Sequence, residues 1–313
     1  MEIIKSGIVI SNDIDFILNG KNAFNFKYSE KMDIPSIDFI NEQRKQLFKD
    51  LCKYFNGDVT ILNEEMIYEI MHSLLEKHMG EDAIVSMDHV YTDDLGECIS
   101  FLDCTRVNGS KKLVTRACPT DENGVEKEIF NISENIKRNN KSSVILADDV
   151  VFSGDTLEYI IDIFSKNGIT VNGVCSAITA ESSIERFKKT LKYGIETGVV
   201  LGNDVIDEIC ERDFYYGIVQ GGINVKSETG AIQKAPYFHP FGNPVERASI
   251  PEKFSKDFSC GCLERSLELW TKIDELTNRE IINNELPEKI INTCPEMSVV
   301  KTLKKSLQNV KKR

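Results

Sequence analysis

The chain has 313 residues, and its 38 basic and 50 acidic side chains give a formal net charge of −12. The length corresponds to about two domains, and a hydrophobic fraction of 41% suits a globular protein with a sizeable core. An acidic chain without a basic stripe is a poor nucleic-acid binder, so no nucleic-acid partner is expected. No apolar run approaches the ~18 residues of a membrane span, and acidic residues interrupt the N-terminus where a signal peptide is apolar. We therefore expect a cytoplasmic protein with no membrane partner.

The nine cysteines are an odd number, and only Cys260 and Cys262 lie close together. No second pair and no histidine pair completes a metal-binding set. Reduced, mostly structural cysteines are therefore expected, in keeping with a reducing compartment. The role of Cys260 and Cys262 is left open.

The first 35 residues mix short apolar runs with Asn and Asp, which is typical of strands and loops. A polar amphipathic helix is predicted over Ser36–Tyr54, and a second helix begins after Asn63, a suitable N-cap. The second helix carries one apolar stripe at the helical period, formed by Met66, Ile67, Ile70, Met71, Leu74 and Leu75.

Three strand-like runs follow, at Ala83–Tyr91, Cys98–Cys104 and Lys112–Arg116. Asn108-Gly109, between the last two runs, is a strong hairpin signal. A polar helix is then predicted over Glu126–Arg138.

A βαβ unit comes next. Val144–Ala147 is an apolar run typical of a buried parallel strand. The helix that follows has one apolar face and ends at Asn167-Gly168, and Ile169–Ile178 is the next predicted strand. Strand, loop, helix and strand at this spacing indicate parallel pairing.

Beyond this unit we expect a helix near Ser182–Lys192, a short strand near Val199 and a strand that begins at Phe214. The Gly- and Pro-rich stretch 221–244 is the predicted boundary. Ser249 is the expected N-cap of a helix that runs to about Leu276, and the basic tail from Lys301 is expected to be solvated.

These elements predict an α/β protein in three consecutive parts. Residues 1–58 form an N-terminal addition of strands and a helix. Residues 59–225 form an α/β core, with a mainly parallel sheet flanked by helices. Residues 226–313 form an extension that is loop-rich at first and then mostly helical.

The candidate chemistry lies where the apolar strand of the βαβ unit ends. Asp148 and Asp149 follow the strand, and the turn Ser153-Gly154-Asp155-Thr156 leads into the helix. Carboxyl ends of parallel strands are where α/β proteins bind ligands, and backbone N–H groups at a helix N-terminus bind anions. Two acids suit diol hydroxyls or a metal, and the turn suits a phosphate, so a ribose that carries a phosphate fits both.

The segment Val144–Leu157 resembles the PRPP-binding motif of type I phosphoribosyltransferases. In that motif, a hydrophobic strand is followed by two acids, two apolar residues and a Thr/Ser-Gly-x-Thr/Ser turn. The resemblance covers about residues 59–225 and implies a flavodoxin-like core. It also implies a magnesium-assisted transfer of phosphoribose from PRPP to a small-molecule acceptor in nucleotide metabolism, with release of pyrophosphate. A homodimer is left open.

By this resemblance, Asp148 and Asp149 bind the ribose hydroxyls and are the catalytic candidates, and either of them could contact Mg²⁺ held through PRPP. Ser153, Gly154, Asp155 and Thr156 hold the 5′-phosphate, and Phe152 is a further PRPP-binding candidate. Two positions depart from the family pattern. Phe152 stands where Asp or Thr is common, and in the hypoxanthine-guanine branch an acid there handles a purine proton. Asp155 stands where Gly, Ala or Lys is usual, and its carboxylate must point away from a phosphate.

The remaining site candidates are weaker. Pyrophosphate needs cations, which the predicted hairpin could supply through Arg106, Lys111, Lys112 and Arg116; exposed charges at a hairpin tip are the alternative. An aromatic acceptor pocket could be built from Phe152, Phe214, Tyr215 and Tyr216, although clusters like the last three are more often core.

Three other interpretations of the motif stay open. The paired acids could be a solvated strand end beside a capping turn. The fold could be that of a regulator that binds PRPP without catalysis. A receiver domain of a phosphorelay also opens with an apolar strand and paired acids. It needs a phosphoacceptor Asp directly after a later strand, however, and the run 198–201 is followed by Gly-Asn-Asp.

Overall fold

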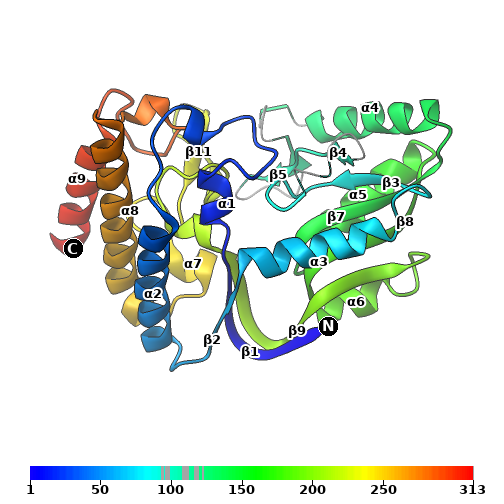
Figure 1. Ribbon diagram of the computed structural model, residues 1–313, viewed down its shortest axis with the longest axis horizontal. Coiled ribbons are helices and arrows are strands. Elements are labelled where there is room, and N and C mark those ends of the chain that lie inside the picture. The colour runs from blue at the N-terminus through cyan, green and yellow to red at the C-terminus, as the bar shows by residue number, and fades with distance from the viewer. Residues whose placement is uncertain (93–94, 96–98, 108–112, 116–119, 122, 313) are drawn as a thin grey trace. The chain divides into compact units, whose positions relative to one another are not determined.

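The computed structural model describes residues 1–313 except 93–94, 96–98, 108–112, 116–119, 122 and 313 (Figure 1). The chain forms two compact units, and each is made from two stretches. Unit 1 comprises Met1–Ser6 and Asn63–Val205, and unit 2 comprises Gly7–Leu62 and Ile206–Arg313. This division differs from the three consecutive parts predicted, because composition marks loops along the chain but does not show that distant stretches pack together.

The described residues form a seven-stranded sheet with the order β2-β1-β9-β8-β7-β3-β4. Its parallel pairings include β1–β2, β3–β4, β3–β7, β7–β8 and β8–β9. The strands are β1 (Glu2–Ser11), β2 (Val59–Leu62), β3 (Ala83–Ser86), β4 (Ile99–Phe101), β7 (Ser143–Val151), β8 (Thr170–Ala180) and β9 (Gly194–Cys210). The predicted α/β class with a mainly parallel sheet is confirmed.

Unit 1 contains the neighbouring strands β4-β3-β7-β8-β9. Numbered along the chain within this unit, their order is 2-1-3-4-5, the flavodoxin-like arrangement. The order reverses between β3 and β7, and in open α/β sheets the carboxyl ends at such a point line the ligand crevice.

Helices cover both faces of the unit 1 strands (Figure 1). Helices α4 (Gly124–Arg138) and α5 (Asp155–Lys166) share a core cluster with Val144 and Leu146 of β7. Helix α3 (Glu64–Glu76) contacts β7 and β8 and is seen in front of them in Figure 1. The short helix α6 (Glu181–Phe187) follows β8 without a loop.

Several predicted elements of unit 1 are confirmed. Asn63 caps α3 by accepting a hydrogen bond from the Glu65 N–H at 2.7 Å. A hairpin forms between β5 (Thr105–Arg106) and β6 (Leu113–Val114), which pair antiparallel. Its first strand follows the predicted run Cys98–Cys104, whose strand β4 pairs parallel with β3, and Asn108-Gly109 lies outside the described residues. Helix α5 ends at Asn167 as expected.

Unit 2 is mostly helical beyond the end of β9. It contains α1 (Ile14–Leu18), α2 (Ile37–Tyr54), a β10–β11 hairpin (Ile223–Lys226, Ile232–Ala235), α7 (Pro244–Ala248), α8 (Ser255–Thr277), α9 (Val299–Lys312) and short 3₁₀ turns at Tyr28–Glu30, Glu211–Phe214, Glu252–Phe254 and Asn283–Glu285. Its core includes the fully buried Trp270 of α8. The helical character of the C-terminal extension is therefore confirmed, with a hairpin added.

Three local predictions in and around unit 2 are wrong, and one predicted strand is present but longer than expected. Ser249 is the left-handed C-cap of α7, so it does not start a helix. The strand expected at Phe214 is a 3₁₀ turn. The strand near Val199 belongs to the 17-residue β9. The basic tail is helix α9, which buries Val299 and Leu303, because its apolar residues recur at the helical period between the lysines.

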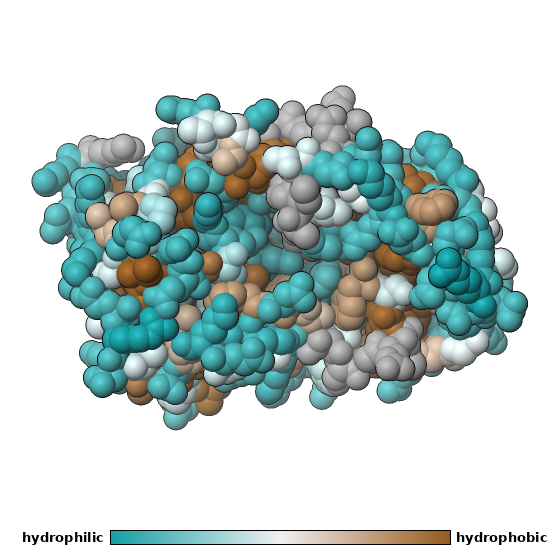
Figure 2. Space-filling model, turned by 90° about the horizontal axis from the view of Figure 1, so that it is seen from above, coloured by the Kyte–Doolittle hydropathy of each residue, from teal (hydrophilic) through white to brown (hydrophobic). Residues whose placement is uncertain are grey.

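Hydrophilic side chains cover most of the face seen in Figure 2, and apolar ones are scattered among them. Within the described part of the chain, every helix is either too short or too polar to cross a membrane.

Candidate functional site

The acid pair lies inside β7, whereas the sequence placed it after the strand. Strand β7 continues to Val151, and Asp148 is paired in register with Ser176 of β8. The predicted strand stopped at Ala147 because paired acids are rare in a buried strand. Successive side chains of a strand point to opposite faces, so Asp148 and Asp149 diverge. The Asp149 carboxylate accepts a hydrogen bond from the Val150 N–H at 2.9 Å.

The neighbouring strand β3 ends beside the acids. The Met87 N–H donates to the Ala147 carbonyl at 2.8 Å. The buried Asp88 carboxylate then accepts from the N–H groups of Val90 and Tyr91, at 2.8 Å each, and so fixes the turn after β3. The single strand predicted over Ala83–Tyr91 is therefore too long. The Asp88 acceptor in that run was the available signal for the turn.

The turn after β7 has a backbone shape that requires glycine. Gly154 is the N-cap of α5 and has φ 75°, in the left-handed region. A Cβ atom at Gly154 would lie 2.6 Å from Cε2 of Phe187, so a side chain there would strain the backbone and displace the Phe187 ring. The turn therefore leads directly into the first turn of a 12-residue helix, where backbone N–H groups can face an anion.

A hollow of about 210 Å³ opens at this turn. Its lining residues are Asp148, Val150, Val151, Phe152, Ser153, Gly154, Thr156 and Leu157. Phe152 is 43% exposed, unusual for a phenylalanine, and forms part of this wall. The structure thus brings Asp148, Phe152, Ser153, Gly154 and Thr156 together as predicted, while Asp149 is not among the lining residues.

Helix α6 holds the turn from outside. The Ser183 hydroxyl donates to the Phe152 carbonyl at 2.7 Å. Arg186 Nη1 donates to the Ser153 carbonyl and to the Asp155 carboxylate, both at 2.8 Å. The hydrogen bond to Asp155 raises the pKa of the Arg186 guanidinium above its ordinary value. These contacts depend on where β8 delivers α6, so no local pattern in the sequence could reveal them.

The Asp155 carboxylate is directed to Arg186 through this ion pair. The resemblance required that carboxylate to point away from a bound phosphate. The ion pair supplies a partner for it on α6 and partly neutralises it.

Oxygen donors at the hollow fit a magnesium ion shared with a ligand. Mg²⁺ is usually bound by one or two carboxylates together with substrate phosphates, without a complete protein cage. The half-buried Asp148 supplies one such carboxylate. Among the described residues no group of three or more His, Cys, Asp or Glu could hold a metal by itself.

The pyrophosphate candidates are only partly described. Arg106 lies on β5, so its backbone belongs to the hairpin in unit 1. Lys111, Lys112 and Arg116 lie outside the described residues. The hairpin itself was predicted, and the role of its cations stays a prediction.

The aromatic candidates Phe214, Tyr215 and Tyr216 belong to unit 2 and are 0%, 2% and 0% exposed. The Tyr216 hydroxyl donates to the Asn283 side chain at 2.8 Å, and Trp270 Nε1 donates to the Tyr216 carbonyl at 2.7 Å. Rings without exposed surface cannot stack on a base, so burial favours the core interpretation over the acceptor pocket.

Burial gives Cys262 a structural explanation. Cys260 and Cys262 both lie on α8, and burial raises the pKa of the Cys262 thiol to about 12, which disfavours the thiolate that metals require. Between them, a Cβ at Gly261 would lie 3.1 Å from the Asp50 carboxylate and from Arg265, which form an ion pair at 2.6 Å. The absence of a side chain at Gly261 therefore leaves space for the Asp50–Arg265 ion pair. The seven described cysteines form no disulfide.

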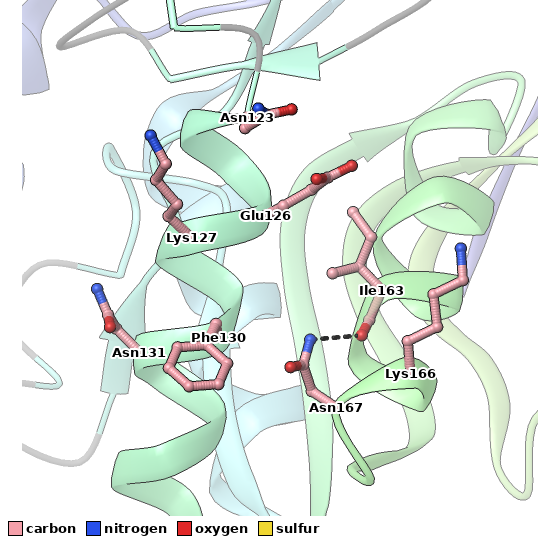
Figure 3. Close-up of a pocket in the computed structure, with 8 residues that line it drawn as sticks. All are labelled: Asn123, Glu126, Lys127, Phe130, Asn131, Ile163, Lys166 and Asn167. Carbon is pink, nitrogen blue, oxygen red and sulfur yellow. Dashed lines mark hydrogen bonds between the residues drawn. The ribbon is translucent and has the colours of Figure 1, made fainter.

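A second hollow, of about 800 Å³, lies between α4 and α5. Figure 3 shows side chains of α4 on one side and of α5 on the other, with the 51%-exposed Phe130 among them. Its two lysines pair with neighbouring acids, Lys127 with Asp121 and Lys166 with Asp162. The α5 residues here come from the C-terminal end of the helix, away from the turn after β7, so this hollow is separate from the candidate site.

The comparisons with known proteins assign no family to the chain. No family model matches the chain, and no curated protein matches it. A crystal structure described as TT1426 from Thermus thermophilus is similar over 44% of this chain and 82% of its own, with 14% sequence identity and a TM-score of 0.27. At that TM-score the likeness carries no argument about fold or function.

Proposed function

We propose that the protein binds PRPP at the turn after β7 and is a Mg²⁺-dependent phosphoribosyltransferase that releases pyrophosphate. One observation supports this most. A glycine-dependent turn at a helix N-terminus and the Asp148 carboxylate line one hollow, at the point where the strand order of unit 1 reverses. A phosphate fits the first feature and a ribose diol fits the second.

Each residue then has a distinct task. The backbone N–H groups of Ser153–Thr156 and the hydroxyls of Ser153 and Thr156 bind the 5′-phosphate. Asp148 accepts hydrogen bonds from ribose hydroxyls and offers an oxygen to Mg²⁺. When bound, Mg²⁺ neutralises charge on the departing pyrophosphate. The negative charge of Asp148 also stabilises the positive charge that develops on the ribose.

A regulator that binds PRPP without catalysis is the second candidate, and Phe152 favours it. Phenylalanine has no titratable or hydrogen-bonding atom, so it cannot act as an acid or base at the hollow. The receiver interpretation makes the acid-bearing strand the opening strand of the domain, whereas β3 and β4 precede β7 in unit 1. The strand order of unit 1 is nevertheless one that receiver domains share, so a ligand test is needed.

Calorimetry with PRPP and Mg²⁺ tests binding, and PRPP consumption with a panel of bases tests catalysis. Stabilisation by PRPP should be readily measured, since a ligand at 100 times its Kd adds ~2.7 kcal/mol to the free energy of unfolding. Binding with turnover supports the enzyme, and binding without turnover of any base supports the regulator.

Beryllofluoride, a mimic of the aspartyl phosphate of receiver domains, is the control ligand. It should leave the melting temperature unchanged. Stabilisation by beryllofluoride and not by PRPP would replace the proposal with the receiver interpretation.

A further inference from the structure

Arg186 of α6 makes three hydrogen bonds to the segment that forms the proposed phosphate site. Two go from Nη1 to the Ser153 carbonyl and to Asp155 Oδ1, at 2.8 Å each. The third goes from Nη2 to Glu158 Oε2 at 2.5 Å. One planar guanidinium thus joins the turn to the first helical turn of α5, which a single-point cation such as lysine cannot do.

The same helix contacts the turn at two further points. The Ser183 hydroxyl bonds to the Phe152 carbonyl at 2.7 Å, and the Phe187 ring occupies the space left by Gly154. The Phe152 and Ser153 carbonyls point to α6, and in a planar trans peptide the N–H group points opposite to the carbonyl. The N–H groups that follow these carbonyls therefore point away from α6. The contacts from α6 therefore define which side of the turn presents donors.

The charges in this segment give Arg186 a second task. Asp155 and Glu158 both lie in the first turn of α5 and bring two negative charges close to the proposed phosphate site. Such charges repel a phosphate, although they favour the helix dipole. Arg186 pairs with both of them and directs the Asp155 carboxylate to α6.

We infer that Arg186 is a positioning residue: it holds the turn 152–155 in its ligand-binding shape and neutralises Asp155, without itself touching the ligand. This inference rests on the proposed function for its ligand and on the α6 contacts for its geometry. Because the Arg186 side chain is 36% exposed, its ion pairs add little to global stability. Its effect is local to the turn.

The test compares the wild type with Arg186→Ala, Arg186→Lys, Arg186→Ala/Asp155→Ala and, as the matched control, Lys188→Ala. Lys188 is a cation just beyond the same helix, and it pairs with the exposed Glu185 at 3.4 Å, away from the turn. Two quantities are measured: amide hydrogen exchange of the segment 150–160 without ligand, and PRPP affinity by calorimetry.

We expect Arg186→Ala to speed exchange in this segment and to weaken PRPP binding roughly tenfold or more, as for lost charged hydrogen bonds. Arg186→Lys should be intermediate, the double variant should regain part of the affinity as the repulsion is removed, and Lys188→Ala should match the wild type. Melting temperatures should stay within a few degrees of the wild type, which excludes general unfolding.

The two proposals fail in different ways. A wild type that does not bind PRPP refutes the proposed function, while exchange still decides whether Arg186 holds the turn. Unchanged exchange in Arg186→Ala overturns the positioning role. So does PRPP affinity that is unchanged in Arg186→Ala when the wild type binds.

Discussion

The turn 152–156 in unit 1 and the segment 214–216 in unit 2 were both candidate site segments in the sequence, yet the structure treats them in opposite ways. The first is a partly exposed turn, whose shape is set by Gly154 and by hydrogen bonds from α6. The second is buried, and its rings and backbone are held by Ser266, Trp270 and Asn283. Residue type alone indicates which chemistry a segment could perform. Exposure decides whether its side chains can contact a ligand.

The comparison also predicts that substitutions in the two segments will have different effects. A substitution in the buried segment of unit 2 removes packing contacts and so lowers the free energy of unfolding. A substitution at the turn alters its shape or charge and so lowers ligand affinity. Variants should therefore divide into two groups.

The largest effect is expected at Tyr216. Tyr216→Ala should lower the free energy of unfolding by about 3–5 kcal/mol, as for other large-to-small aromatic substitutions in a core. Tyr216→Phe keeps the ring and loses the hydroxyl with its bond to Asn283, so its cost in the free energy of unfolding should be smaller, about 1–3 kcal/mol. Denaturant unfolding measures both values. Equal stability of Tyr216→Ala and the wild type would show that this ring is not core.

Gly154→Ala should abolish measurable PRPP binding, because the side chain would strain the left-handed backbone and collide with Phe187. Gly168→Ala is the matched control. Gly168 also has positive φ, 73°, but a Cβ there meets no atom within 4 Å. Both variants should lose about 1–2 kcal/mol of stability from backbone strain, and only Gly154→Ala should lose affinity. Normal PRPP binding by Gly154→Ala would contradict the proposed site.

Asp148→Asn should weaken PRPP binding more than tenfold, since a hydrogen bond to a charged group contributes about 1.5–3 kcal/mol. Asp149→Asn should have a smaller effect, because Asp148 lines the hollow and Asp149 bonds to the Val150 N–H. The double variant Asp148→Asn/Asp149→Asn should lose at least as much affinity as Asp148→Asn. Asp162→Asn, on α5 at an exposed position, serves as the control for net charge. Calorimetry distinguishes the variants, and a folded double variant with unchanged affinity would refute the site.

The smallest effect is expected at Phe152. Phe152→Leu keeps an apolar wall and should change PRPP affinity less than threefold, about 0.7 kcal/mol.

The unmodified protein should not turn over hypoxanthine or guanine, because Phe152 cannot donate or accept a proton. Assays with these purines and with anionic acceptors such as orotate decide this. Robust turnover of hypoxanthine would show that another residue supplies the acid or base.

Elements with a local signal were predictable from the sequence. The Asn63 cap, the stripe of α3 and the C-terminus of α5 follow from capping and periodicity. The turn after β7 was found because its glycine, hydroxyls and acids are consecutive. The parallel sheet followed from the βαβ spacing.

Features made by tertiary contacts could not be predicted. The extension of β7 through its acids depends on pairing with β8, and the role of Arg186 depends on where α6 lies after β8. Ser249 was misassigned because Ser and Pro near a helix start resemble a cap, whereas the backbone there has φ 51° and ends α7. The position of β7 at the reversal of strand order is visible only once β3 and β4 are placed.

The division of unit 2 into two stretches has a consequence for synthesis on the ribosome. Met1–Ser6 of unit 1 and then Gly7–Leu62 of unit 2 are translated before the long stretch Asn63–Val205 of unit 1, and Ile206–Arg313 of unit 2 follows that stretch. Helix α2 therefore emerges before most of unit 1, while α8, which it contacts, emerges only after it. Nearly all of unit 1 can fold during that interval, since chains generally fold in units as they are made. The apolar face of α2 that packs on α8 therefore stays uncovered by its partner until this later stretch has been made.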